Sequence, residues 1–364
     1  MANLIDALPG VGMPVGEVLD RIATMWAGGE SGSPSEFRAS QMNVVLHFGF
    51  PVSAEDARAR FNALLRFAQR YPSRIIVLCP KSPGGGEAMD AKLFSQCYIG
   101  ESHREMCCCE ALLLSFNPDD CGHLANQVSV WLEPDLPVYH WFSQVPPKRI
   151  RAYFNNLLPG VRRTIYDSSV EGGTLDDLEW PEPDRVRDLA QARLLPVRQA
   201  LGQFLSAYPA GQLVEGLREV TVRHEQGLTG EGMRLLEWVR GSLEACARNA
   251  KTAAFETVFG REELPEAAAA TSGAPLQQTK SGTKGSARQA QPANLKRKES
   301  GEASVAKALE MDWEYEDGRY FHWQKFKCGE VGEIRAHLGA AEEVIPTRTK
   351  ALPPEQELAE ALFF

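Results

Sequence analysis

Short apolar runs bounded by proline, aspartate or serine recur through the first half of the chain. Three of them occupy residues 71–80, 133–142 and 162–169. Runs of this length with turn residues at both ends are typical of buried strands. Amphipathic stretches alternate with the runs, and the one that begins at Ser53 repeats apolar residues at i, i+3, i+4 and i+7. This alternation predicts an α/β domain whose open sheet is mostly parallel or mixed, with helices on its faces.

The elements of this first domain can be placed by residue number. We predict strands at residues 41–50, 74–79, 92–100, 106–116, 136–142 and 163–166. We predict helices at residues 14–27, 53–71, 117–132 and 147–158. Asp56 follows Ser53 at the spacing of a capping box, and Pro72 ends that helix. The domain is predicted to span residues 1–172.

The pattern changes after an acidic segment at residues 171–184, which predicts a second, α+β domain over residues 173–364. We predict helices at 184–207, 230–249 and 354–362, and strands at 217–224, 253–259, 311–316, 319–327 and 330–337. Asp317-Gly318 is a strong signal for a two-residue hairpin turn. Because a hairpin and one helix are too small to fold alone, we expect them to complete the sheet that begins near Leu217.

Residues 266–303 differ from the rest of the chain in composition. They are rich in Ala, Ser, Gly, Gln, Pro and Lys, lack aromatic residues, and between Thr271 and Lys298 carry six basic residues and no acidic one. Such a segment buries too little apolar surface to offset its ordering entropy, so we predict a disordered linker. Limited proteolysis is expected to cut there first. A nucleic-acid tether at residues 280–298 is a weaker hypothesis, and salt-dependent binding would be its mark.

Composition narrows the class of protein. The chain has 43% apolar and 24% charged residues, a net charge of −9 and a pI near 5.5. This is an ordinary globular composition, and the acidic balance argues against a general nucleic-acid binder. We expect a cytoplasmic protein, because neither a membrane-length apolar run nor a secretory signal is present in the sequence. The sequence leaves the oligomeric state of the chain open.

Candidate chemistry is sparse, and the residues predict binding without a cofactor. Gly10, Gly12 and Gly16 lack the spacing and the preceding strand of a dinucleotide fingerprint. The loop at residues 81–86, Lys-Ser-Pro-Gly-Gly-Gly, follows a strand but lacks the Gly-Lys-Ser/Thr ending of a phosphate loop. Asp167 and Ser168 end a strand, which is where open α/β sheets place ligand groups.

The cysteines suggest packing or a thiol switch rather than a metal site. Cys107, Cys108 and Cys109 are consecutive, whereas structural zinc sites usually separate their cysteines by two to four residues. Alternation along a strand puts Cys107 and Cys109 on one face, and Cys121 begins the next element. A direct bridge between residues 107 and 109 would be strained, so Cys121 is the easier redox partner. Packing remains the favoured interpretation of these thiols.

Several short motifs, taken in order, resemble one known family. They are Pro72-Ser73-Arg74 before a strand, Asp135-Leu136-Pro137-Val138 followed by Trp141, and a strand that ends in Asp167-Ser168. This order is similar to that of the glucose-6-phosphate dehydrogenase assembly proteins, the OpcA family. The resemblance covers nearly the whole chain except residues 266–303, and none of its motifs is catalytic.

The resemblance implies a function and a set of candidate contacts. It implies a non-catalytic partner that binds glucose-6-phosphate dehydrogenase, at the entry to the oxidative pentose phosphate pathway of carbohydrate metabolism, as an assembly factor or allosteric activator. The motif residues are then candidates for partner binding: Ser73, Arg74, Asp135, Trp141, Asp167 and Ser168. The alternative is an enzyme or sensor that binds sugar phosphates or nucleotides through the loop at residues 81–86. Thermal shifts with glucose 6-phosphate and NADP separate the two hypotheses.

Overall fold

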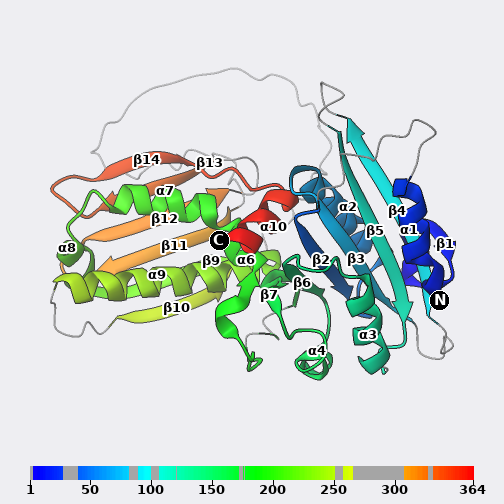
Figure 1. Cartoon of the computed structure of the whole chain (residues 1–364). Helices are drawn as coiled ribbons and strands as arrows, with labels where there is room; N and C mark the ends of the chain where they lie inside the picture. The colour runs from blue at the N-terminus through cyan, green and yellow to red at the C-terminus, as the bar shows by residue number, and fades with distance from the viewer. Residues whose placement is uncertain are drawn as a thin grey trace, which may run out of the picture.

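The computed structural model describes most of the chain. The described residues are 3–27, 40–81, 89–99, 106–119, 121–171, 175, 177–250, 257–264, 307–326 and 331–364. The predicted linker at 266–303 therefore lies outside them. The described chain forms two sheets, each with helices packed on it (Figure 1). The predicted α/β class, with a mixed first sheet, is confirmed.

The first sheet has eight strands in the order β1-β4-β5-β3-β2-β6-β7-β8. Their bounds are β1 Val11–Met13, β2 Met42–Phe48, β3 Ser73–Pro80, β4 Asp90–Ile99, β5 Met106–Phe116, β6 Val138–Ser143, β7 Val161–Tyr166 and β8 Val186–Asp188. From β5 to β8 every neighbouring pair is parallel, whereas β4 pairs antiparallel with β5 and β1 pairs antiparallel with β4. The sheet is thus parallel at its centre and antiparallel at one side.

The order of the parallel strands defines a doubly wound sheet. The chain runs outward from β2 through β3 to β5, then returns to the other side of β2 and runs outward again through β6, β7 and β8. This is the order of the doubly wound dinucleotide-binding folds, and it reverses between β2 and β6. Ligands of such sheets bind at this switch point, beyond the carboxyl ends of the strands.

Helices cover both faces of the first sheet and create two apolar cores. One core joins the sheet to α2 (Ala54–Arg70) and to α10 (Pro354–Phe363), which returns from the far end of the chain. The other core lies under α1 (Val18–Ala27), α3 (Cys121–Trp131) and α4 (Pro147–Tyr153). Because both faces are covered, strands β2 and β3 are buried at every position.

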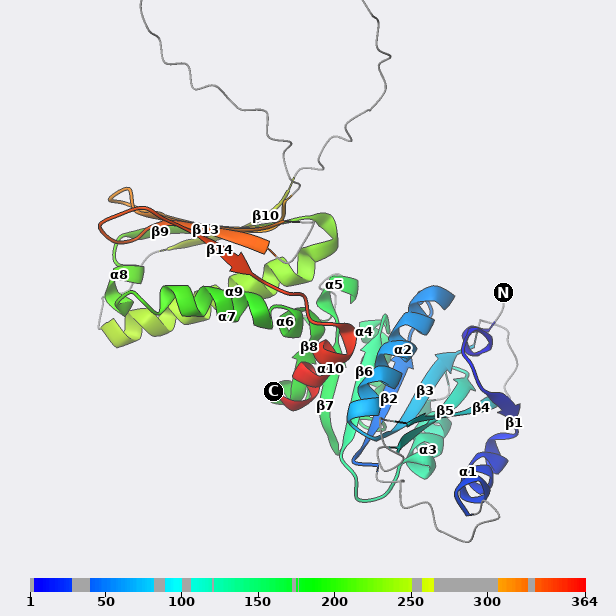
Figure 2. The same ribbon diagram turned by 90° about the horizontal axis from the view of Figure 1, so that it is seen from above.

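The second sheet has six strands in the order β10-β9-β11-β12-β13-β14. Their bounds are β9 Leu217–His224, β10 Val258–Glu263, β11 Lys307–Tyr315, β12 Tyr320–Phe326, β13 Val331–His337 and β14 Glu343–Arg348. Helices α7 (Leu195–Leu205), α8 (Ala210–Val214) and α9 (Thr229–Ala250) lie on one side of it (Figure 2). Apolar side chains of β9, β11, β12 and β13 pack against these helices in a third core.

Several local predictions are confirmed by the structure. Ser53 caps α2, because its Oγ accepts a hydrogen bond of 3.0 Å from the Asp56 amide. Gly318 has the positive φ, 84°, that the predicted hairpin turn requires. The hairpin β11–β12 joins the sheet that begins with β9, since β11 pairs antiparallel with β9. The predicted helix and strand at 230–249 and 330–337 correspond to α9 and β13.

Other predictions are wrong in detail. The helix predicted at 184–207 is instead β8, α6 (Leu189–Arg193) and α7, because Val186–Asp188 pairs with β7 and the Asp188 carboxylate caps α6. The strand predicted at 253–259 begins later, at Val258, and residues 251–256 lie outside the described part. Strands β1 and β14 were not predicted. Both are short edge strands with mostly exposed side chains, so they lack the apolar pattern of a buried strand.

A buried ion pair joins the amino end of β3 to the middle of β5. Arg74 on β3 lies beside Glu110 on β5, and the guanidinium donates to the Glu110 carboxylate at 2.6 and 2.7 Å. The same group also contacts the Glu133 carboxylate at 2.6 Å and the Trp131 carbonyl at 3.3 Å. Arg74 and Glu110 are 6% and 4% exposed, so removing one would leave the other as a buried, uncompensated charge.

We expect Arg74→Met to lower the free energy of unfolding by about 3–5 kcal/mol, the range for breaking a buried pair. Urea denaturation measures this change. The double variant Arg74→Met/Glu110→Gln is the control, because it removes both charges together. It should be more stable than the single variant. Equal or additive losses would contradict a coupled pair.

Candidate functional site

The backbone of the chain fills the start of the crevice at the switch point between β2 and β6. Gly49, just past β2, donates its amide to the Ser143 carbonyl at 2.8 Å. A side chain at position 49 would place its Cβ 1.7 Å from the carbonyl oxygen of Gln144. Gln144 itself has a positive φ of 55°, which directs this carbonyl toward Gly49. The loops after β2 and β6 are thus in direct backbone contact where a ligand crevice would begin.

A partly buried carboxylate from the short helix after β7 fixes this contact. The Glu171 carboxylate, at the end of α5 (Ser168–Glu171), accepts a hydrogen bond of 2.6 Å from the Gln144 amide. Burial raises the pKa of Glu171 to about 7, against the opposing effect of that hydrogen bond. The loops after β2, β6 and β7 are therefore joined to one another across the switch point.

Two histidines lie directly beneath these loops. His47 Nδ1 and His140 Nε2 are 3.2 Å apart, on neighbouring strands β2 and β6, and both side chains are almost fully buried. Aromatic rings surround His47, with the ring of Tyr153 at 4.9 Å and that of Phe116 at 5.5 Å. Burial lowers the pKa of His140 to about 3, and burial together with His140 lowers the pKa of His47 well below its usual value. Both rings are therefore neutral, and the pair forms one internal hydrogen bond.

A guanidinium surrounded by three carboxylates lies beyond the end of β7. Arg193 of α6 contacts Asp167 at 2.6 Å, Glu231 of α9 at 2.6 Å and Glu357 of α10 at 3.3 Å. Its two terminal nitrogens donate to both oxygens of Asp167, a bidentate arrangement with high geometric specificity. Ser169 also donates to Glu231. Arg193 thus ties the end of the first sheet to the helix α9 of the second and to α10.

A second arginine makes a parallel connection. Arg234 of α9 contacts the Asp188 carboxylate at 2.5 Å and the Tyr166 hydroxyl at 2.6 Å. Asp188 also accepts from the backbone amides of Ser168 and Ala190, at 3.0 and 2.9 Å. Near Arg193, burial raises the pKa of Glu357 to about 7. The neighbouring carboxylates Asp167 and Glu231 act in the same direction, and Arg193 opposes them. Together, Arg193 and Arg234 form an ion cluster between the two sheets.

The six candidate partner-binding residues occupy different environments. Ser73, Arg74, Trp141 and Ser168 are buried, and Trp141 belongs to the core under α2 and α10. Ser73 donates to the Tyr71 carbonyl at 2.6 Å. Asp167 is partly exposed and is held by Arg193, whereas Asp135 is exposed with a positive φ of 65°. The structure brings Asp167 and Ser168 together and leaves Asp135 apart, on the loop before β6.

The other candidates are only partly described. Cys109 is buried in the core of the first sheet, while nothing is described of the Cys107 and Cys121 side chains. The redox prediction therefore stays a prediction. Lys81 is 6% exposed and its ammonium group lies 2.7 Å from the Asp90 carboxylate. The rest of the loop, residues 82–88, lies outside the described part.

Sequence reasoning missed most of the ion cluster. It singled out Asp167 as a strand end, but Arg193, Glu231 and Glu357 come from three helices far apart in the chain. One signal was available. Arg193 and Glu231 interrupt otherwise amphipathic helices at positions that pack inward, and charged residues at such positions are usually paired.

The geometry defines a class of protein: a doubly wound α/β sheet with its switch point closed by its own loops, tied by ion pairs to an α+β sheet. Residues 66–180, which include β3 to β7, match the model of the glucose-6-phosphate dehydrogenase subunit N-terminal domain of the OpcA family. This part of the chain is thus similar to the OpcA proteins, as its motifs indicated.

Two curated relatives carry the same name. An OxPP cycle protein OpcA of Synechocystis sp. is 25% identical over 183 residues, which is 49% of this chain and 38% of that protein. Its counterpart in Synechococcus elongatus is 27% identical over 190 residues, 48% of this chain and 40% of that protein. The matched region therefore spans well under half the length of either relative.

Two solved structures align with most of this chain, at low sequence identity and low TM-score. A glucose-6-phosphate 1-dehydrogenase from Mycobacterium avium aligns over 89% of this chain and 87% of its own, with 10% identity and a TM-score of 0.45. An aldose-aldose oxidoreductase from Caulobacter crescentus aligns over 88% of this chain and 87% of its own, with 9% identity and a TM-score of 0.36. Neither carries an argument here. Among the described residues, no helix has the length and apolarity to cross a bilayer.

We expect Gly49→Ala to disrupt the contact between the loops after β2 and β6. The new Cβ would overlap the Gln144 carbonyl, so one loop must move. A loss of about 1–3 kcal/mol in unfolding free energy is expected, as for overpacked sites. The control is Gly122→Ala on α3, where an added Cβ meets nothing within 4 Å. Unfolding curves that show equal stability for both variants would contradict the close approach.

The buried histidine pair contributes stability that is lost in acid. Both folded pKa values lie below the unfolded value near 6.5, so below that pH the unfolded chain binds protons that the native protein does not. Each histidine should contribute a loss of about 1.4 kcal/mol per pH unit as pH drops below 6.5, whereas the raised pKa values of Glu171 and Glu357 contribute in the opposite direction. His140→Gln should remove about half of this dependence. An unchanged slope between pH 6.5 and 4.5, measured by urea denaturation, would exclude the pair as its source.

Proposed function

We propose that this protein binds glucose-6-phosphate dehydrogenase and promotes its activity or assembly, without performing catalysis itself. The match of residues 66–180 to a domain described as a glucose-6-phosphate dehydrogenase subunit carries the proposal. The names of the OpcA relatives, which refer to the oxidative pentose phosphate cycle, support it. The protein then acts in carbohydrate metabolism as an assembly or regulatory subunit of an enzyme.

The geometry of the switch point supports a binding role. At the switch point the backbones of Gly49 and Gln144 are in contact, and the Glu171 carboxylate accepts a hydrogen bond from the Gln144 amide. The side chains of His47 and His140 are neutral and buried below them. These groups hold the loops at the carboxyl edge of the sheet in fixed positions. A rigid edge of this kind is suited to presenting a surface to a protein partner, because little conformational entropy is lost on binding.

Exposed apolar residues flank this rigid edge. Phe50 follows Gly49 and is 45% exposed, and Val170 precedes Glu171 and is 38% exposed. Exposed aromatic side chains at interfaces often carry a large share of the binding energy. We therefore propose Phe50 as the first contact to test. Asp135 and Asp167, from the family motifs, remain further candidates.

Activation requires only that the protein bind one state of the dehydrogenase more tightly than another. A difference of about 1.4 kcal/mol in binding free energy shifts the balance between two states tenfold. Preferential binding to the assembled oligomer would promote assembly, and preferential binding to an active conformation would raise the rate. Both effects follow from binding alone.

The test uses the full chain and its cognate dehydrogenase. We expect co-purification of the two proteins, and a change in the oligomeric mass or in the rate of NADPH formation in a coupled assay. Phe50→Ala should weaken binding by about tenfold or more, as for an interface anchor. The control is Val130→Ala on α3, since Val130 is 59% exposed but lies on another element.

Two outcomes would contradict the proposal. The first is the absence of any complex together with unchanged kinetics and oligomeric mass of the dehydrogenase. The second is a thermal shift of the isolated chain with glucose 6-phosphate or NADP that Lys81→Ala abolishes, which would favour the sugar-phosphate or nucleotide hypothesis. A ligand at 100 times its dissociation constant stabilises by about 2.7 kcal/mol, so the shift is measurable.

A further inference from the structure

A polar pocket lies where β8 meets α6, α7 and the last turn of α10. Figure 2 shows these elements together near the carboxyl end of the chain. The volume of the pocket is about 310 Å³, and small-molecule sites in proteins have volumes of about 300–1,000 Å³. Arg187 of β8 and Arg198 of α7 line it, together with Gln191 of α6 and Glu360 of α10. Two cations from separate elements therefore border one cavity.

The arginines around this pocket lack carboxylate partners. The Arg198 guanidinium group makes no hydrogen bond or ion pair with any residue that the structure describes, although its Nε is buried. Arg187 donates only to two nearby main-chain carbonyls, at 2.8 Å each. Arg163 of β7, whose charge lies close to that of Arg187, donates to the Ala361 carbonyl at 3.2 Å. Among the described residues, each of these three groups thus lacks an acid at ion-pairing distance.

The pKa values of these arginines show the same lack of compensation. Burial lowers the pKa of Arg198 and of Arg163, and the charge of Arg187 lowers that of Arg163 further. Glu360 acts on Arg198 in the opposite direction, but burial has the larger effect. Burial also acts on Arg193, yet its carboxylate partners outweigh burial and raise its pKa. The positive charge at the pocket is therefore only partly balanced, unlike that of the ion cluster.

Two acidic side chains line the same pocket, and neither pairs with its arginines. The Asp188 carboxylate is already used, because it accepts from two backbone amides and pairs with Arg234 at 2.5 Å. Glu360 acts on Arg198 at a distance, without forming an ion pair with it. A bound anion would supply the missing counter-charge. Glu360 and Gln191 would then face the uncharged part of the ligand.

We propose that this pocket binds a phosphate group, with Arg187 and Arg198 as the residues that hold it. A phosphate carries three strong acceptor oxygens in a tetrahedral arrangement, so guanidinium groups that approach from β8 and from α7 can both donate to it. A carboxylate has its two oxygens in one plane, an arrangement that a single arginine fork already satisfies. The inference is independent of dehydrogenase binding, and its test needs only the isolated chain.

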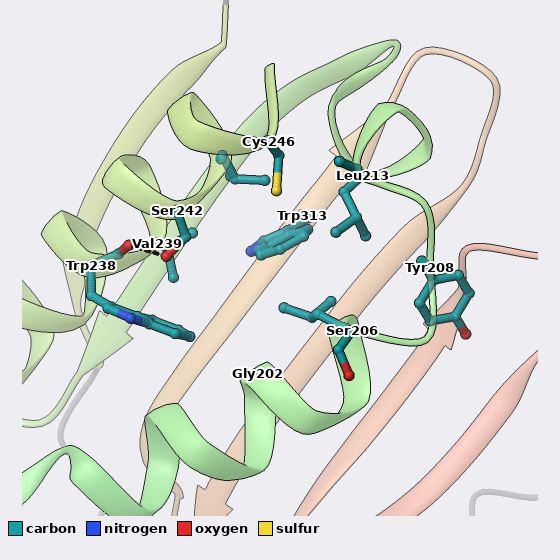
Figure 3. A pocket seen from close by; sticks show the side chains of 12 residues that line it. Gly202, Ser206, Tyr208, Leu213, Trp238, Val239, Ser242, Cys246 and Trp313 are labelled. Carbon is teal, nitrogen blue, oxygen red and sulfur yellow. Dashed lines mark hydrogen bonds between the residues drawn. The ribbon is translucent and has the colours of Figure 1, made fainter. Parts of the chain in front are cut away.

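Another cavity beside α7 provides an internal comparison. It lies between α7, α8, α9 and β11, and its volume is about 250 Å³ (Figure 3). Leu213, Val239 and Trp313 are among its lining residues, and none of the described side chains that line it is charged. An anion there would lose its hydration without gaining a counter-charge. We therefore expect phosphate to bind at the polar pocket and not at this apolar one.

The test is calorimetric titration of the full chain with sodium phosphate, in a buffer that contains no other oxyanion. Arg198→Met and Arg187→Met should each weaken binding by about tenfold or more, the range for a hydrogen bond to a charged group. Glu360→Gln should tighten binding, because it removes a negative charge from the wall. In NMR spectra, phosphate should shift the Nε–H resonance of Arg198. Acetate at the same ionic strength should bind more weakly than phosphate.

Two variants serve as controls. Arg218→Met makes the same change of charge at an exposed position of β9, and it should leave phosphate binding unchanged. Gly202→Leu fills the apolar cavity, where an added Cβ meets nothing within 4 Å, and it should also leave phosphate binding unchanged. Urea denaturation checks that Arg198→Met is folded, which is expected because its guanidinium group makes no bond to the described residues.

A comparison of inorganic phosphate with glycerol 3-phosphate identifies the source of the phosphate group. Tighter binding of glycerol 3-phosphate would identify a phosphate monoester whose hydroxyl groups contact Gln191 and Glu360. Tighter binding of inorganic phosphate would identify the free ion. Both results support the proposed site.

The proposal is overturned if phosphate does not bind, or if acetate binds as tightly as phosphate. It is also overturned if Arg198→Met and Arg218→Met weaken binding equally, because the attraction would then depend only on net charge. Binding that is lost in Lys81→Ala and retained in Arg198→Met would place the phosphate at the loop after β3 instead.

Discussion

The ion pairs of Arg193 are the interaction that holds the two sheets together. Its guanidinium joins Asp167 at the end of β7, Glu231 on α9 and Glu357 on α10, three elements that no stretch of backbone connects directly. Three carboxylates around one arginine leave an excess of negative charge, and the raised pKa of Glu357 is its consequence together with burial. Arg234 lies beside this cluster and pairs with Asp188 and Glu237. Protonation of Glu357 would thus weaken one of the ion pairs of Arg193.

The switch point shows how a doubly wound sheet can close its own ligand crevice. Its strand order provides a switch point, yet the Gly49 and Gln144 backbones meet there, with Glu171 as a brace. The usual glycine-rich turn, which leaves space for a pyrophosphate, is replaced by Gly-Phe-Pro-Val-Ser after β2. The strand order of a dinucleotide-binding sheet is retained. The contacts between the loops after β2, β6 and β7 occupy the place where a ligand would bind in such a sheet.

The sequence predicted what is local and periodic. The capped helix at Ser53, the continuous apolar strand β3 and the turn at Gly318 each depend on a few neighbouring residues, and each was found as predicted. Strand β14 was missed because its exposed side chains lack a buried pattern. The Arg193 cluster was missed for a different reason: its members come together only when α6, α9 and α10 pack. Long-range charge pairing leaves no periodic trace in a single sequence.

Helix α10 has a consequence for how the chain folds during synthesis. Phe363 contacts the rings of Tyr71 and Phe67, at 4.8 and 6.1 Å, so the core under α2 contains a residue made long after β8. At about 5–20 residues per second, roughly 10 to 30 seconds separate the synthesis of β8 from that of α10. During that interval the first sheet exposes an apolar surface on one face. Until α10 has been synthesised, this apolar surface lacks the helix that covers it in the folded protein.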